Sequence, residues 1–545
     1  MANIASALVE VARRRPDDTA LIAPVGWGWH RSTFNEVHAR AATYADFFRG
    51  QGIGPGNRVM LMVRPSLEFV CLAFALFAVG AVVILIDPGM GYRNLLRCIG
   101  SVRPEFLIAI PKAQIFSRLF PRPFVTVRRR ICVGRALGIL GTELPRPRMD
   151  AELIIAPTHD DELAAIIFTT GSTGPPKGVR YQHRIFLAQL AQIRDYYRIG
   201  QGDVDQPAFP LFALFSIALG ACAVIPDMDP TRPAQVDPVK FIKTINDYGV
   251  TYSFGSPAIW QVISRHALAQ GLHLPSLRKV LMAGAPVPGD LIERLHAVLP
   301  DDAEIHIPYG ATESLPIVSI TGREVLSETW PLTRLGLGVC VGRSLPGIEV
   351  RVIPVSDGPL DRLPDSLPSQ EGEGLALAAC PIGEIIVRGP VVTTGYDHND
   401  EENRLAKILD GHEVWHRVGD LGYWDGAGRL WFCGRKAHRV RTAHGTLYTI
   451  CCEAIFNCHP LVNRSALVGV GEPGRQRPVL IVEPKARIDN RRRLFADLRE
   501  LAVQQSHTAS IEDFLIHDAF PVDIRHNAKI FREQLALWAA SRVDG

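Results

Sequence analysis

The sequence predicts an α/β protein with a large N-terminal domain of doubly wound sheets, a small β-barrel-like subdomain and a small α+β C-terminal domain. Three changes of pattern along the chain support this prediction. Short apolar runs first alternate with helical stretches, which is typical of parallel sheets covered by helices. From Val339 onward the pattern turns to short strands and turns, and after Gly434 a smaller unit mixes helices with strands. We therefore divide the chain into an N-terminal domain, residues 1–434, and a C-terminal domain, residues 435–545.

The first α/β series extends from Leu8 to about residue 155. Its apolar runs predict strands at 59–63, 82–86 and 106–110, with helical stretches between them. The three arginines 128–130 and the Pro-rich stretch up to Met149 predict a solvent-exposed excursion after the third strand. The alternation of strands and helices predicts a parallel sheet with helices on both faces.

An uncharged segment over residues 69–86 is long enough to cross a membrane. Gly80 interrupts it, its second half is rich in β-branched residues, and Asp87-Pro88 ends it. These features favour a buried helix followed by a buried parallel strand, and we expect no membrane span.

The second α/β series predicts strands near 164–168, 250–254, 279–282 and 304–307. The region after it predicts strands at 348–353 and 384–387, joined through a polar, Pro-rich loop over residues 357–373. The length of the chain corresponds to about three or four units of ordinary domain size.

Composition limits the classes of partner. The chain has 59 basic and 56 acidic side chains and a net charge of +3, which argues against nucleic acid or an anionic membrane surface as an obligatory partner. The N-terminus carries no basic stretch followed by an apolar run, and the ten cysteines are scattered, so we expect a cytoplasmic protein with reduced thiols. We predict no zinc site, because no CxxC pair occurs among Cys433, Cys451, Cys452, Cys458 and His459.

The strongest chemical signal is a loop rich in glycine and hydroxyl groups that follows the strand at 164–168. Small residues let backbone N–H groups approach an anion, hydroxyl groups add donors, and a lysine supplies positive charge. The chain has only nine lysines against 50 arginines, so the lysine that ends this loop stands out. The loop is not a GxxxxGK[ST] loop, because Pro176 and Gly178 flank its lysine. We predict that it binds phosphate through Thr169, Thr170, Gly171, Ser172, Thr173, Gly174 and Lys177.

With this loop, the chain resembles the adenylate-forming superfamily of acyl-CoA synthetases, peptide-synthetase adenylation domains and luciferases. Further blocks follow in the family's order over almost the whole chain: Gly284-Ala285-Pro286, Tyr309-Gly310-Ala311-Thr312-Glu313, residues 383–396, residues 416–421, Gly434-Arg435 and Lys529. Several blocks in the same order make the resemblance specific. It implies that the chain uses ATP and Mg²⁺ to convert a carboxylic acid into an acyl adenylate.

The resemblance implies a nucleotide site. Gly284, Ala285 and Pro286 would form the adenine-binding loop, and Tyr309 would cover the adenine face. Asp420 would accept hydrogen bonds from both ribose hydroxyls, because a carboxylate has two acceptor oxygens.

The resemblance also implies the groups that act on phosphate. Thr312 would bind phosphate, and Glu313 would hold Mg²⁺, a metal that prefers hard oxygen ligands. Lys529 would be the catalytic lysine that bridges the substrate carboxylate and the α-phosphate, because bringing two anions together requires neutralisation by the site.

Lys529 lies in the C-terminal domain, far in sequence from the phosphate loop. We therefore expect the small domain to be mobile and to close over ATP as a lid. Arg435 begins the hinge, which we expect near Lys436–His438, where Ala437 and His438 replace an aspartate that is usual in the family.

The block that would bind the acid is wholly apolar, from Phe209 to Phe215. This composition fits a long alkyl chain better than an amino acid, with Phe212 and Phe215 as candidate substrate-binding residues. Where CoA ligases commonly carry a G-x-R-I-x-P-x-E-I-E stretch, the chain keeps Gly445 and Glu453 but lacks the arginine, the proline and the first glutamate. The sequence therefore gives thin support for CoA as the acceptor.

The stretches 210–218 and 523–532 closely resemble the olefin β-lactone synthetases of bacterial long-chain hydrocarbon biosynthesis. That resemblance implies a long-chain 2-alkyl-3-hydroxy fatty acid as substrate, whose own 3-hydroxyl displaces AMP to give a β-lactone. It also implies other enzymes of the olefin pathway as partners. His183 and His526 are candidates for the base that assists the hydroxyl.

Two alternatives remain beside the β-lactone synthetase. The chain could be a long-chain fatty acyl-CoA synthetase or a fatty acyl-AMP ligase, which share the first half-reaction. It could also be a catalytically silent scaffold that binds nucleotide. The chain keeps the charged and hydroxyl groups that the reaction needs, which argues against a catalytically silent scaffold. These groups are Lys177, Thr312, Glu313, Asp420 and Lys529.

Overall fold

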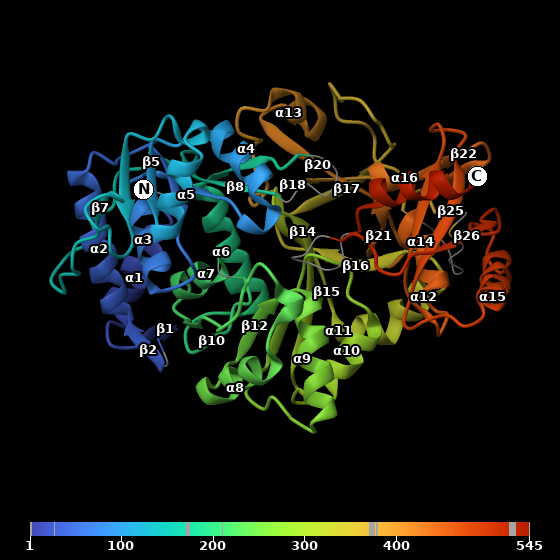
Figure 1. Ribbon diagram of the computed structural model, residues 1–545, viewed down its shortest axis with the longest axis horizontal. Helices are drawn as coiled ribbons and strands as arrows, with labels where there is room; N and C mark the ends of the chain where they lie inside the picture. The colour runs from blue at the N-terminus through green and yellow to red at the C-terminus, as the bar shows by residue number, and fades with distance from the viewer. Residues whose placement is uncertain are drawn as a thin grey trace.

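The computed structural model describes residues 3–26, 28–169, 175–209, 211–369, 377, 380–522 and 530–543. Figure 1 shows a large body, coloured blue to light orange, and a smaller unit in dark orange and red at the C-terminal end of the chain. The body contains a seven-stranded and a fourteen-stranded sheet with helices packed on them. The mixed α/β fold with a large sheet-rich N-terminal part is as the sequence predicts.

The seven-stranded sheet is parallel except at its last pair, where β9 runs antiparallel to β8. Its order is β7 (Thr142–Glu143), β6 (Arg129–Cys132), β5 (Phe106–Ala109), β3 (Arg58–Met62), β4 (Val82–Leu85), β8 (Leu163–Phe168) and β9 (Gly178–Gln182). The three strands that the sequence predicts in the first series are present within one residue at each end.

The arginine run 128–130 is only partly the solvent-exposed excursion that the sequence predicts. Arg129 and Arg130 begin β6, which pairs in parallel with β5. Ile131 and Cys132, the next two residues, are fully buried and anchor the strand. The arginines obscured a strand whose apolar half is only two residues long.

The uncharged segment forms the buried helix α3 (Leu67–Ala78) followed by β4, as predicted. The Ser66 side chain accepts a hydrogen bond from the Phe69 N–H and caps the helix. Gly80 adopts a positive φ of 75° in the turn that leads into β4, a conformation that glycine tolerates. Across the described parts of the chain, no helix is both long and apolar enough to span a bilayer.

The fourteen-stranded sheet changes character along its length. Its parallel part comprises β1 (Thr19–Val25), β11 (Cys222–Val224), β10 (Val204–Asp205), β12 (Tyr252–Gly255), β13 (Lys279–Met282) and β14 (Glu304–Ala311), with β2 (Gly28–Thr33) antiparallel at one edge. Its antiparallel part comprises β15 (Ser314–Thr321), β16 (Val339–Ser344), β21 (Leu430–Arg435), β20 (Glu413–Trp424), β19 (Lys407–Asp410), β18 (Gly383–Arg388) and β17 (Glu349–Ile353). The turn between β14 and β15 lies where the two parts meet.

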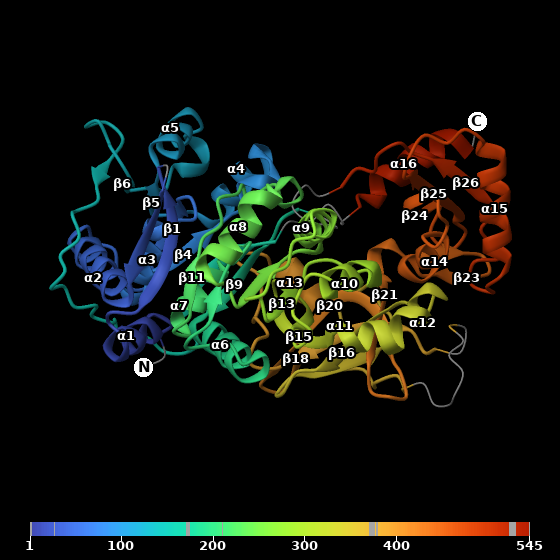
Figure 2. The same ribbon diagram turned by 90° about the horizontal axis from the view of Figure 1, so that it is seen from below.

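Helices cover both sheets. Besides α3, those of the body are α1 (Ala5–Arg14), α2 (Phe34–Gly50), α4 (Tyr92–Val102), α5 (Pro111–Leu119), α6 (His183–Tyr197), α7 (Phe212–Ala218), α8 (Pro238–Tyr248), α9 (Pro257–Ala269), α10 (Gly289–His296), α11 (Gly322–Glu324), α12 (Trp330–Arg334) and α13 (Asp400–Ala406). In both views α6 and α7 lie where the blue and green parts meet (Figure 2). These two helices therefore stand between the sheets and, as shown below, border the main cavity.

The unit that follows β21 has two small sheets. One pairs β22 (Val440–Thr442) with β23 (Gly445–Leu447), and the other joins β24 (Val462–Val470), β25 (Arg477–Pro484) and β26 (Asp513–Ile516). The helices α14 (Thr449–Phe456), α15 (Arg491–Val503) and α16 (Arg532–Val543) complete it. Asp357 of the body accepts hydrogen bonds from Arg439 and Arg441 of this unit.

Candidate active site

A cavity of about 1280 Å³ runs through the body and reaches the C-terminal unit. Apart from the histidine candidate His183, the predicted site residues that the structure describes line this cavity: Thr169, Lys177, Phe212, Phe215, Gly284, Ala285, Pro286, Tyr309, Thr312, Glu313, Asp420 and Arg435. Thr170, Gly171, Ser172, Thr173, Gly174 and Lys529 lie outside the described residues. Residues chosen from separate sequence blocks are thus brought to one place.

The turn between β14 and β15 carries Thr312 and Glu313 into the cavity. The hydroxyl of Tyr181, on β9 of the other sheet, donates to the Thr312 carbonyl oxygen at 2.5 Å. The Gln189 amide, on α6, donates to the Leu315 carbonyl oxygen at 2.8 Å on the far side of the turn. Contacts from two elements therefore fix the turn in position.

Neighbouring residues hold Glu313 at two points, its backbone carbonyl oxygen and one of its carboxylate oxygens. The N–H and the hydroxyl of Thr393 both donate to the Glu313 carbonyl oxygen, at 2.9 and 3.0 Å. The Tyr396 hydroxyl donates to Glu313 Oε1 at 2.7 Å. Burial, reinforced by the Glu313 charge, raises the pKa of Tyr396, so the phenol remains a donor. No described residue donates to the second oxygen, Oε2, and a carboxylate placed in this way can act as a ligand for a hard cation.

Lys177 ends the predicted phosphate loop and is engaged by an acidic partner. Its Nζ lies 2.6 Å from Glu402 Oε2, on α13, and 5.2 Å from the centre of the Tyr396 ring. The Thr169 N–H donates to the Lys177 carbonyl oxygen at 3.0 Å, which ties the two ends of the loop together. The lysine is therefore positioned at the loop with its charge balanced by a partly buried carboxylate.

Asp420 lies at the centre of a second charged group. The Tyr309 hydroxyl donates to Asp420 Oδ2 at 2.6 Å, and Arg435 Nη1 lies 3.1 Å from Oδ1. Asp420 and Arg435 are partners in the β20–β21 ladder, which explains how distant blocks meet. Burial and the adjacent carboxylate raise the pKa of Tyr309 well above its usual value. This arrangement can present carboxylate oxygens to hydroxyl groups of a ligand.

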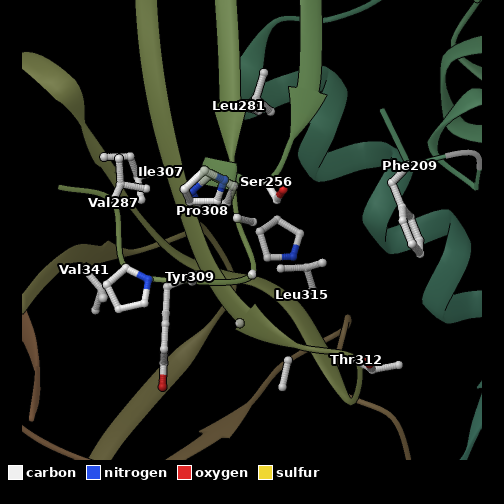
Figure 3. A pocket seen from close by; sticks show the side chains of 18 of the residues that line it. Phe209, Ser256, Leu281, Val287, Ile307, Pro308, Tyr309, Thr312, Leu315 and Val341 are labelled. Atoms are coloured by element: carbon white, nitrogen blue, oxygen red, sulfur yellow. The ribbon is translucent and has the colours of Figure 1, made fainter. Parts of the chain in front are cut away.

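Figure 3 shows Tyr309 and Phe209 on opposite sides of the labelled part of the cavity. On the Phe209 side the wall is aromatic. The Phe212 ring stacks on Phe254 with 3.8 Å between ring centres, and Phe215 lies 5.9 Å from Phe212 and 6.1 Å from Phe186. One cavity thus joins a polar end to an apolar end.

The histidine candidate His183 is not among the described residues that line the cavity. Its side chain is fully buried, and Nδ1 accepts a hydrogen bond from the Ile4 N–H at 3.3 Å. Burial lowers the pKa of His183 to about 4, so the ring is neutral. These contacts give His183 a structural role at the N-terminus. The other candidate, His526, lies outside the described residues.

Sequence reasoning missed three polar residues of the site. Glu402 pairs with Lys177, and Tyr396 was assigned only to a structural block. Lys407 is almost fully buried, donates to the Thr393 carbonyl oxygen at 2.5 Å, and burial lowers its pKa to about 7. Its rarity as one of nine lysines was a signal that could have drawn attention to it.

Clusters of acidic, histidine and cysteine side chains are the other places where a protein could bind a metal ion. Within the described ranges, no group of three or more His, Cys, Asp or Glu side chains is placed to hold a metal ion. All ten cysteines are free thiols.

Comparison with known proteins adds three findings. A family profile described as AMP-binding enzyme matches residues 8–397. An olefin beta-lactone synthetase of Xanthomonas campestris is 46% identical, covering 99% of this chain and 98% of the relative, and one of Stenotrophomonas maltophilia is 44% identical, covering 99% of each. The solved structure of the amide bond synthetase McbA from Marinactinospora thermotolerans matches with a TM-score of 0.79 at 21% identity, covering 98% of this chain and 99% of that one.

Proposed function

Since the chain belongs to the AMP-binding enzyme family and is a close relative of olefin β-lactone synthetases, we propose that it makes a β-lactone from a long-chain 2-alkyl-3-hydroxy fatty acid and ATP. A carboxylate oxygen of the acid attacks the α-phosphorus and pyrophosphate leaves. The 3-hydroxyl oxygen then attacks the carbonyl carbon, the bond to AMP breaks, and the hydroxyl proton passes to a base. The observation that carries this proposal is the single cavity that joins Lys177, Glu313 and Asp420 to the aromatic wall.

The polar end of the cavity would hold the nucleotide. Asp420 would accept hydrogen bonds from the ribose hydroxyls while Tyr309 and Arg435 keep its carboxylate in place. The ring of Tyr309 and the loop Gly284-Ala285-Pro286 would border the adenine. A site that is organised before the ligand arrives loses less entropy on binding.

The phosphates would lie between the loop 169–177 and the β14–β15 turn. Lys177 would exchange Glu402 for phosphate oxygens, and Thr312 would add a hydrogen bond. Glu313 would hold Mg²⁺, which supplies charge neutralisation at the phosphates; its hydrogen-bonded Oε1 and available Oε2 suit a metal that takes few protein carboxylates and completes its shell with phosphate and water.

The C-terminal unit would act as a lid that delivers Lys529. We propose the boundary between residues 434 and 435, one residue before the end of β21 at Arg435, where the short helix Lys436–His438 follows. Lys436 donates to Glu384 and to the Ser356 carbonyl oxygen, both at 2.8 Å. These contacts would anchor the hinge on the body while the residues beyond it turn.

The apolar end would bind the alkyl part of the acid, with Phe212 and Phe215 in its wall. The enzyme would work in the cytoplasm, and an enzyme that acts on β-lactones would consume its product. Other olefin-pathway enzymes are the partners that this placement suggests.

The decisive experiment omits any thiol. The protein is incubated with a 2-alkyl-3-hydroxy fatty acid and Mg-ATP, and the products are analysed by mass spectrometry and by pyrophosphate release. We expect a product lighter than the acid by one water, together with AMP. If turnover instead requires CoA and yields a thioester, the protein is an acyl-CoA ligase. If the Asp420→Ala variant performs equally well, the observed turnover does not come from this site.

A further inference from the structure

One face of α6 borders the cavity over most of the helix. Its cavity-lining residues, in chain order, are Phe186, Gln189, Leu190, Ile193 and Tyr197. These positions recur at intervals of three and four residues and therefore form a continuous stripe. From first to last the stripe extends about 16 Å along the helix.

The catalytic turn lies beside the middle of this stripe. The Gln189 amide donates to the Leu315 carbonyl oxygen at 2.8 Å, and Leu315 follows Thr312 and Glu313 by only a few residues. The cavity consequently continues from the turn toward both ends of α6.

Toward the N-terminal end of α6, the cavity is walled by one hydrophobic cluster. Phe186 lies 5.6 Å from Phe77, ring centre to ring centre, and Ile4 and Phe74 line the same region. We call the part of the cavity bordered by Ile4, Phe74, Phe77 and Phe186 the first arm.

Toward the C-terminal end of α6, a different hydrophobic cluster forms the wall. Tyr197, Ile199, Tyr252 and Leu281 belong to this cluster and line the cavity, with Ile193 packed against them. We call the part bordered by these five residues the second arm.

Helix α7 separates the two arms. Phe215 contacts Phe186 of the first arm, with ring centres 6.1 Å apart. One residue later, the Ser216 hydroxyl accepts a hydrogen bond from Tyr252 of the second arm at 2.9 Å. Adjacent residues of one helix thus face different arms.

We propose that the two arms bind the two alkyl chains of one branched acid, with its carboxylate at the Thr312–Glu313 turn between them. This inference rests on the proposed function, because a 2-alkyl-3-hydroxy acid carries its chains on neighbouring carbons, C2 and C3. The chains can leave those carbons in opposite directions, as the arms leave the turn. A linear acid fills one arm and leaves apolar surface of the other exposed to water.

The arms also differ at their walls. In the second arm, Ser216 donates to Asp205 Oδ2 at 2.5 Å, and both side chains are almost fully buried. Asp205, Ser216 and Tyr252 therefore place a polar group along an otherwise apolar wall, whereas the first arm is bordered by apolar side chains. An alkyl chain gains less by lying against a partly polar wall than against an apolar one, so the second arm accepts the shorter chain.

The test uses two series of synthetic acids. In one series the C2 chain is lengthened while the C3 chain is constant, and in the other the reverse. The variants are Ile193→Phe, which narrows the second arm, and Phe186→Leu, which widens the first, both from the same stripe of α6. The control is Arg194→Gln, an exposed neighbour whose charge pairs with Asp195. Lactone formation and pyrophosphate release are measured as kcat/KM.

We expect Ile193→Phe to lower kcat/KM about tenfold for the long members of one series and to leave the other series unchanged. Phe186→Leu is expected to extend the accepted length in the other series only. The inference is overturned if both variants shift both series alike, or if the wild-type protein shows the same length limit in the two series. Failure of the proposed function looks different: no branched acid is then converted without a thiol, whatever its chain lengths.

Discussion

The two ends of the cavity are built in different ways. At the polar end each charged group has a fixed partner: Lys177 has Glu402, Asp420 has Arg435, and Glu313 has the Tyr396 hydroxyl. At the apolar end the wall consists mainly of rings and aliphatic side chains from α3, α6, α7 and β12, which pack through dispersion contacts, apart from the hydrogen-bonded group of Asp205, Ser216 and Tyr252. The polar end should therefore respond to single substitutions by large factors, and the apolar end by graded ones.

The largest effect is expected from Lys529→Ala. If Lys529 is the cation that bridges carboxylate and α-phosphate, as we propose, removing it should lower pyrophosphate release by about 100-fold or more, with little change in the KM for ATP, because its charge would act in the transition state. Stopped-assay pyrophosphate measurements check this, with Lys485→Ala as a control in the same C-terminal unit. Near-normal release from Lys529→Ala would show that the catalytic lysine is elsewhere.

The second largest effect is expected from Asp420→Ala. Loss of the buried carboxylate that we propose as the ribose ligand should raise the KM for ATP about 10- to 100-fold, since hydrogen bonds to charged groups are strong. Tyr309→Phe removes only one hydrogen-bond partner of that carboxylate and should raise the KM for ATP less. Equal effects of the two substitutions would mean that Asp420 acts mainly through its contact with Tyr309.

Phe212→Ala probes the other end. Losing the stacked contact with Phe254 should raise the KM for the acid about tenfold and leave the KM for ATP unchanged. Steady-state kinetics with each substrate varied separately measure the two constants, and thermal unfolding checks that the fold persists. A matched rise in both constants would contradict the separation of the two ends.

The buried Asp205 should make stability depend on pH. Burial raises the pKa of its carboxyl to about 8, from 3.8 in the unfolded chain. The folded protein keeps this proton while the unfolded chain releases it, so the group's contribution to the free energy of unfolding is full below pH 3.8 and is lost as pH rises through about 8.

Asp205→Asn removes that titration. The free energy of unfolding of the variant, relative to that of the wild type, should therefore increase from pH 5 to pH 8. Urea denaturation at several pH values measures this difference. Asp160→Asn, at an exposed position, serves as the control and should show no such gain. A constant difference between wild type and Asp205→Asn over this range would mean that Asp205 is charged when folded.

The smallest effect is expected from Glu402→Gln. Glu402 competes with phosphate for Lys177, so its neutralisation should lower the KM for ATP about two- to fivefold. Isothermal titration with ATP in the absence of the acid measures the change directly. Weaker binding would instead show that Glu402 is needed to hold Lys177 at the loop.

The same contrast explains how much the sequence could predict. The residues of the polar end occur in the sequence as short blocks, because each of them must present a particular chemical group at a particular point of the backbone. Tyr309, Thr312 and Glu313 are consecutive or nearly so, and their common location could be inferred before any coordinates. Asp420 and Arg435 meet through a strand ladder that their separate blocks did not reveal.

The residues of the apolar end do not form recognisable blocks in the sequence. Phe77, Phe186 and Leu281 come from three distant elements and read in the sequence as ordinary core residues, since any of several apolar side chains can fill the same space. Glu402 was equally inconspicuous, because an acidic residue in a run of three at a helix start is usually a solvated cap. Strand β6 was hidden because half of its residues are arginines.

Asp357 forms an exposed polar contact between the body and the C-terminal unit. Its carboxylate binds Arg439 at 2.7 Å and Arg441 at 3.1 Å, just beyond the hinge, and the aspartate itself is largely exposed. Exposed ion pairs are worth about 1 kcal/mol or less and are screened by dissolved ions. Dissolved ions should therefore weaken this part of the contact between the unit and the body, and turnover that depends on the proposed swing of the unit should acquire a salt dependence even though no charged substrate is involved in that step.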